Sequence, residues 1–86
     1  MKLKTVLKKA ITQYNKYRSP EVTATLLSIN EKFFEVQFTG PFCRTCGFYD
    51  YFDDLRVLLE DFGTRVKVAE IKEIPEGAVV KFEVIE

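Results

Sequence analysis

The apolar residues of this 86-residue chain change their spacing along the sequence from a helical period to strand-like alternation, and do so twice. This change of period constrains the fold more than any other feature. Residues 3–17 carry apolar side chains at helical spacing with lysines on the opposite face, so they predict an amphipathic helix. Its apolar stripe consists of Leu3, Val6, Leu7, Ala10, Ile11, Tyr14 and Tyr17. We expect Ser19 and Pro20 to end the helix.

Two strand patterns follow this helix. Residues 22–29 are rich in valine, threonine, leucine and isoleucine, and residues 34–38 alternate apolar with polar side chains. A short polar turn at Asn30 and Glu31 separates the two runs. The pattern predicts a β-hairpin with one buried face.

The second half of the chain repeats the order of a helix followed by two strands. A second apolar stripe predicts a helix that ends at Gly63. Its members are Phe48, Phe52, Leu55, Leu59 and Phe62. Apolar residues in 66–71 and alternating ones in 80–84 predict two further strands, joined by a turn at residues 75–77. We expect the phenylalanines to lie in the core.

This order of elements predicts an α+β fold. Two helices of this length can cover one face of a four-stranded, mainly antiparallel sheet, which gives a two-layer sandwich of order α-β-β-α-β-β. Because 47% of the residues are hydrophobic, we expect a folded chain. Its length suits one domain, so residues 1–86 are predicted to form a single domain.

Charge is distributed unevenly although the net charge is zero. The first 18 residues carry six basic side chains and no acid, whereas residues 50–61 carry five acids beside Arg56. The basic and acidic segments could pair between neighbouring copies of the chain. A basic stripe is also typical of nucleic-acid binding, but the Gly-x-x-Gly loop of the KH-type RNA-binding domains that this fold resembles is missing. A nucleic-acid or protein interaction module therefore remains an alternative function.

Several function classes have no support in the sequence. There is no nucleophile and base pair, phosphate loop or dinucleotide fingerprint, so we do not expect an enzyme. The carboxylates Asp50, Asp53 and Asp54 are expected to interact with the helix dipole and not to catalyse a reaction. No apolar stretch is long enough to span a bilayer, and the N-terminal helix lacks the features of a signal peptide. We therefore expect a cytoplasmic protein without membrane contact.

The only two cysteines, Cys43 and Cys46, form a Cys-x-x-Cys motif between the second strand and the second helix. Such a pair in a reducing compartment is more often a metal or redox pair than a structural disulfide. A thiol near the start of a helix is stabilised as the thiolate, the form that binds metals. Gly40, Pro41 and Gly47 are expected to keep the loop close-fitting around a bound ion or sulfide.

The ligand inventory leaves several chemistries open. The chain has no histidine and no further cysteine, so a zinc site or an iron–sulfur cluster would need ligands from a second chain, a thiol or a substrate protein. Thiol–disulfide exchange needs only one chain, but the usual redox fold places this motif in a β-α-β context. The two cysteines can also be small buried side chains with a structural role.

The element order and the cysteine loop together resemble the iron–sulfur cluster assembly domains, which include the C-terminal domain of NifU and the MIP18/PaaD-like proteins. The NifU-type pattern has a glycine shortly before Cys-x-x-Cys, and Gly40 stands there in this chain. The MIP18-type pattern has Thr-x-Pro-x-Cys at the end of the second strand, matched by Thr39, Pro41 and Cys43. Its upstream Asp-Pro-Glu looks like residues 19–21. The paired glycines and aspartate that usually follow the first NifU-type helix are absent.

The resemblance implies a small iron–sulfur cluster assembly or carrier protein. On this interpretation Cys43 and Cys46 would be the ligands of a transient cluster that two copies of the chain share as a homodimer. The partners would be apo iron–sulfur client proteins, to which the cluster is passed.

Overall fold

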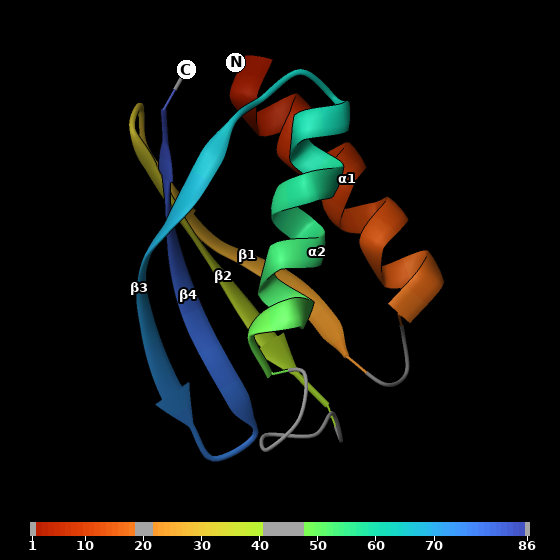
Figure 1. Cartoon of the computed structure of the whole chain (residues 1–86), viewed down its shortest axis with the longest axis vertical. Helices are drawn as coiled ribbons and strands as arrows, with labels where there is room; N and C mark the ends of the chain where they lie inside the picture. Colours follow the sequence, from red (N-terminus) through yellow and green to blue (C-terminus); the bar gives the residue numbers. More distant parts are fainter. Residues whose placement is uncertain (1, 19–21, 41–47, 86) are drawn as a thin grey trace.

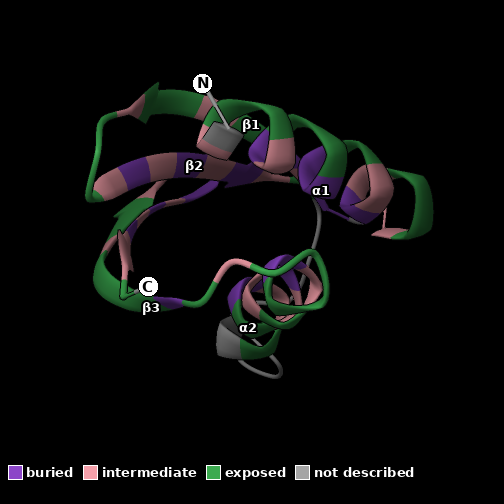
Figure 2. Ribbon diagram, turned by 90° about the horizontal axis from the view of Figure 1, so that it is seen from above, coloured by how far each residue is buried: buried purple, intermediate pink, exposed green. Residues whose placement is uncertain are grey.

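The computed structural model describes residues 2–18, 22–40 and 48–85 (Figure 1). The elements in chain order are α1 (Lys2–Arg18), β1 (Thr23–Ile29), β2 (Phe33–Thr39), α2 (Phe48–Asp61), β3 (Val66–Ile74) and β4 (Gly77–Val84). The predicted α+β class and the order α-β-β-α-β-β are confirmed. The four strands curl around one side of the core, and the two helices close the other side (Figures 1 and 2).

The sheet is antiparallel throughout, with strand order β1-β2-β4-β3. Strands β2 and β4 therefore occupy the centre, and β1 and β3 are the edges. The register between the central strands pairs Phe34 with Phe82 and Val36 with Val80, so these apolar side chains share one face. The rings of Phe34 and Phe82 stack with centroids 5.1 Å apart. This alignment gives the sheet one apolar face, as the alternation in the sequence predicts.

The core lies between this apolar face and the two helices, where the buried positions face inward (Figure 2). Helix α1 contributes Leu7, Ala10, Ile11 and Tyr14, and helix α2 contributes Phe52, Leu55 and Leu59. The largest fully buried side chains of the sheet are Phe34, Phe38, Phe82, Val36 and Val80. The buried residues of each helix thus all belong to the apolar stripe that its sequence predicts.

Both edge strands are interrupted by a shift of register. The shift in β1 falls between Leu26 and Ser28, and the shift in β3 falls between Val68 and Glu70. A bulge bends an edge strand and disturbs its row of free backbone groups, which opposes pairing with a further strand.

The predicted turn at Asn30 and Glu31 and the predicted end of the second helix near Gly63 are confirmed. In the β1–β2 turn, Oδ1 of Asn30 accepts hydrogen bonds from the backbone N–H groups of Lys32 and Phe33 at 2.9 and 2.8 Å. At the end of α2, the N–H of Gly63 donates to the carbonyl of Glu60 at 2.9 Å, and its φ of +94° lies in the region that favours glycine.

Two side chains of the predicted apolar stripes are exposed, and one of them, Phe62, corrects the expectation that the phenylalanines lie in the core. Tyr17 is 71% exposed and Phe62 is 41% exposed. Tyr17 stands one residue before the end of α1 at Arg18. Phe62 follows the last residue of α2, and its backbone N–H lies within reach of the carbonyls of Leu58 and Leu59, where the chain turns out of the helix.

In the described part of the chain, no helix combines the length and the hydrophobicity needed to cross a membrane.

Candidate functional site

The predicted ligands Cys43 and Cys46 lie outside the described residues, as do Pro41 and Gly47. The structure describes both ends of the segment that contains them, which we call the cysteine segment (residues 41–47). It follows Thr39 and Gly40 at the end of β2 and precedes Phe48, the first residue of α2. The surroundings of the predicted site are therefore defined by what holds these two ends.

The end of the cysteine segment that follows β2 is tied to two strands and one turn. Thr39 pairs with Thr23 of β1 on one side and with Gly77 of β4 on the other. The N–H of Gly40 donates to the carbonyl of Glu76 at 3.3 Å, in the turn between β3 and β4. Gly40 has a φ of +135°, a value that glycine adopts far more readily than other residues. The backbone conformation therefore explains why a glycine stands at this position.

Gly77 lets β4 approach this end closely. A Cβ atom at Gly77 would lie 1.8 Å from the carbonyl oxygen of Phe38 and 3.1 Å from the Cα of Thr39, and both are backbone atoms. Only glycine fits, because the strand itself would have to move to make room. The last residues of β2 are thus held between two neighbouring strands.

The second end is held by helix α1. The hydroxyl of Tyr14 donates to the backbone carbonyl of Tyr51 at 2.7 Å. Arg18, at the end of α1, forms an ion pair with Asp54, and its guanidinium lies 5.7 Å from the centre of the Tyr51 ring. These contacts fix the first turns of α2 against the last turns of α1.

A cluster of three rings connects the two ends beneath the surface. The rings of Tyr14 and Phe38 meet edge to face with centroids 5.7 Å apart, and those of Phe38 and Phe52 lie 4.9 Å apart. All three side chains are at most 2% exposed. Because they come from α1, β2 and α2, both ends of the cysteine segment are attached to one packed unit.

The first turns of α2 are acidic. Asp50 and Asp53 are exposed, and a polar hollow is lined by Arg18, Asp50, Tyr51, Asp53 and Asp54. Asp53 accepts a hydrogen bond from Nε of Arg56 at 2.6 Å, and this bond raises the pKa of the Arg56 guanidinium above its ordinary value. Carboxylates here disfavour a further isolated anion and favour a cation.

The surface between the two helices was not predicted from the sequence. A second hollow is lined by Tyr14, Tyr17, Arg18, Asp54, Val57, Leu58 and Asp61. Val57 is 42% exposed and lies outside the predicted stripe of α2. Val57 itself was the signal for this surface in the sequence, because it is an apolar residue among the acidic residues on the outward face of α2.

Among the residues that the structure describes, no three acidic or sulfur-bearing side chains gather closely enough to hold a metal ion. Comparison of the chain with protein-family models, with curated proteins and with solved structures found no match in any of the three. The resemblance to the iron–sulfur cluster assembly domains thus remains a prediction from the residues quoted above.

Proposed function

We propose that this protein carries an iron–sulfur cluster transiently through the thiolates of Cys43 and Cys46 and passes it to an apo-protein. The main support is the attachment of the cysteine segment. Its two ends, at Gly40 and Phe48, are tied to one packed unit by the β3–β4 turn and by the contacts of Tyr51. Because both ends are fixed, ordering the seven residues between them around one metal centre costs less entropy than it would in a free peptide.

The ligand count determines how such a cluster is held. Clusters of this kind are usually bound by four thiolates, and one chain supplies two. Two copies of the chain therefore complete one cluster, and each contributes Cys43 and Cys46. Transfer is then a ligand exchange in which thiolates of the acceptor replace these four, with no change in the oxidation state of iron.

The charges near the motif favour a metal over dithiol redox chemistry. Cys46 precedes the start of α2 by two residues, and a helix N-terminus stabilises a thiolate. Asp50, Asp53 and Asp54 oppose this effect for a free thiolate, the species that thiol–disulfide exchange requires. A bound metal ion or cluster core cancels part of the thiolates' charge, so the same carboxylates oppose metal-bound thiolates less than free ones.

Anaerobic reconstitution with ferrous iron and sulfide tests the proposal. We expect visible absorption from charge transfer between thiolate and iron, together with bound iron and sulfide in equal amounts. The variants Cys43→Ser and Cys46→Ser should each lose the absorption. Thr45→Ser is the matched control, because it changes a side chain between the two thiols but keeps both.

Two results would contradict the iron–sulfur proposal. A colourless protein that retains one zinc ion per two chains would identify a zinc site instead. A colourless protein free of metal under all anaerobic conditions would exclude a metal site. For the transfer step, an apo-ferredoxin serves as the acceptor, and a loaded protein that never delivers its cluster to it would refute the carrier role.

A further inference from the structure

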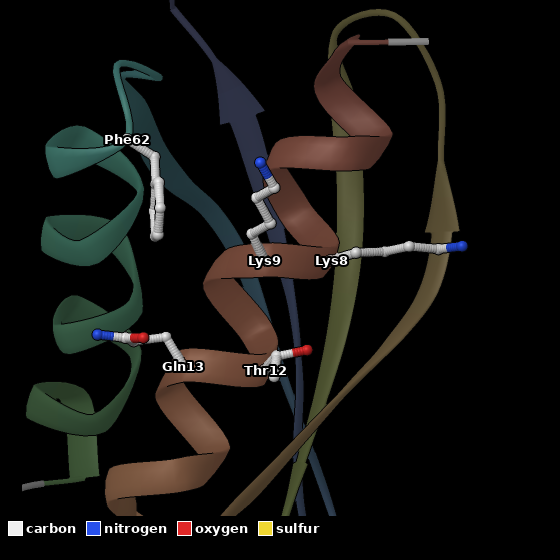
Figure 3. A pocket seen from close by; sticks show the side chains of 5 residues that line it. All are labelled: Lys8, Lys9, Thr12, Gln13 and Phe62. Carbon is white, nitrogen blue, oxygen red and sulfur yellow. The ribbon is translucent and has the colours of Figure 1, made fainter.

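The outer surface of the helix layer combines exposed apolar side chains with hollows between the helices. Helices α1 and α2 lie side by side and run in opposite directions (Figure 1). Three large apolar side chains on this layer are exposed, namely Tyr17 at 71%, Val57 at 42% and Phe62 at 41%. We call these three residues the apolar seam. Phe62 and Gln13 point into the space between the helices, whereas Lys8 and Thr12 point away from α2 (Figure 3).

The two sides of the apolar seam have opposite charge. Helix α1 exposes four lysines and carries no acid, and we call these lysines the basic half. They are Lys4, Lys8, Lys9 and Lys16. Helix α2 exposes four acids beside one arginine, and we call these acids the acidic half. They are Asp50, Asp53, Glu60 and Asp61.

Asp53 and Glu60 pair with Arg56 of the same helix, and Asp50 and Lys16 stand at the helix ends that favour their charge. The remaining charges do not stabilise the helix that carries them. Across the described residues, the four lysines of the basic half form no ion pair, and neither do Asp50 and Asp61. Lys4 stands in the first turn of α1, and Asp61 stands in the last turn of α2. Both positions oppose the dipole of their own helix. The charges of Lys4, Lys8, Lys9 and Asp61 therefore need another explanation.

We propose that the helix layer binds a second copy of this chain across a twofold axis that runs along the apolar seam. Such an axis places α1 of each copy on α2 of the other, so each basic half meets the partner's acidic half. A symmetric dimer uses the same surface twice, and only a self-complementary surface can do so. A layer that is basic on one side, acidic on the other and apolar between them meets that requirement.

The size of the surface sets the strength of the dimer. Helix α1 has 17 residues and is therefore about 25 Å long, and two helices each about 10 Å wide give a face of roughly 500 Å² per copy. The total of about 1,000 Å² lies at the low end of specific interfaces. We therefore expect a reversible dimer that weakens as salt screens the charges.

This inference does not depend on the proposed function, because the dimer needs no metal. It has one consequence for that function. An axis along the seam preserves the direction of each helix, so both copies of α2 begin, at Phe48, at the same end of the dimer. Two cysteine segments would thus leave the dimer from one end.

The test is sedimentation equilibrium of a chain that carries Cys43→Ser and Cys46→Ser, so that neither a metal nor a disulfide can join two copies. One variant reverses the basic half with Lys9→Glu and Lys16→Glu. A second variant reverses the acidic half with Asp50→Lys and Asp61→Lys. The parent chain should dimerise, and each variant alone should dimerise at least tenfold more weakly, because like charges then face each other.

An equimolar mixture of the two variants is the decisive measurement. In the mixed dimer both contacts again join opposite charges, so we expect dimerisation to return to within a few-fold of the parent chain. The matched control Lys32→Glu with Lys72→Glu makes the same change of net charge as the variant of the basic half, on exposed residues away from the helix layer, and should dimerise like the parent. Circular dichroism establishes that each variant is folded, and if a reversal variant is unfolded, Val57→Ser replaces it and should also weaken the dimer.

Three outcomes would overturn the proposal. The parent chain could stay monomeric at every concentration, which would leave the surface to a different partner. The reversed variants could dimerise as well as the parent. Their mixture could stay monomeric under conditions in which the parent dimerises.

Discussion

Replacing Gly77 by alanine tests how closely β2 and β4 approach beside the cysteine segment. The added Cβ would lie 1.8 Å from the carbonyl oxygen of Phe38, whereas ordinary contact begins at 3.4 Å. The strands must therefore separate by about 1.6 Å at this point. Both contacting atoms belong to the backbone, so no side-chain rotation can relieve the overlap.

The expected loss of stability follows from what this separation breaks. It opens the pair between Gly77 and Thr39 and strains the next pair, in which Phe38 and Ala78 are both fully buried. Two backbone hydrogen bonds contribute about 1 kcal/mol each, and overpacking a buried site costs about 1–3 kcal/mol. Gly77→Ala should thus lower the free energy of unfolding by about 3–5 kcal/mol, a large part of the roughly 5–15 kcal/mol typical of a domain.

Urea unfolding followed by circular dichroism measures this loss, and thermal unfolding should show a melting temperature lower by at least about 12 °C. The matched control is Gly63→Ala, since nothing lies within 4 Å of a Cβ there. Its φ of +94° still disfavours alanine, by about 1–2 kcal/mol. A Gly77→Ala variant that loses no more stability than Gly63→Ala would refute the reasoning.

Two further substitutions test the packing of the layers. The side chain of Asn15 donates to the carbonyl of Ala24 at 3.0 Å and accepts from the N–H of Ala24 at 2.7 Å. Asn15→Ala should therefore lower the free energy of unfolding by about 2 kcal/mol, measured by thermal unfolding. A loss below about 0.5 kcal/mol would show that water replaces both bonds. Val80 is fully buried whereas Val68 is 37% exposed. Val80→Ala should therefore cost about 2–3 kcal/mol and Val68→Ala less than about 1 kcal/mol, and equal losses in urea unfolding would contradict the placement of the core.

The sequence predicts the type and place of each described element because these depend on local spacing. The helix observed at Lys2–Arg18 and the helix observed at Phe48–Asp61 begin and end within one or two residues of the predicted positions. The order of the strands in the sheet cannot be predicted from local spacing, because several orders of four antiparallel strands satisfy the same alternation. The central pairing of β2 with β4 depends on contacts such as that of Gly77 with Phe38, which join residues far apart in the chain.

The surroundings of the candidate site were predicted only where a local rule applies. Gly40 was expected in the loop before the cysteines, and its positive φ fits that expectation. Its hydrogen bond to Glu76 and the contact of Tyr14 with Tyr51 could not be predicted, because each depends on tertiary packing. The exposure of Phe62 likewise reflects where the chain leaves α2, and helical periodicity alone does not fix that residue.

The most direct test of the iron–sulfur proposal is native mass spectrometry of the protein reconstituted and kept without oxygen. The account predicts a species with the mass of two chains and one iron–sulfur cluster, and predicts that Cys43→Ser and Cys46→Ser each abolish it. A wild-type chain that retains neither iron nor sulfide, whatever amounts of both are supplied, would contradict the account.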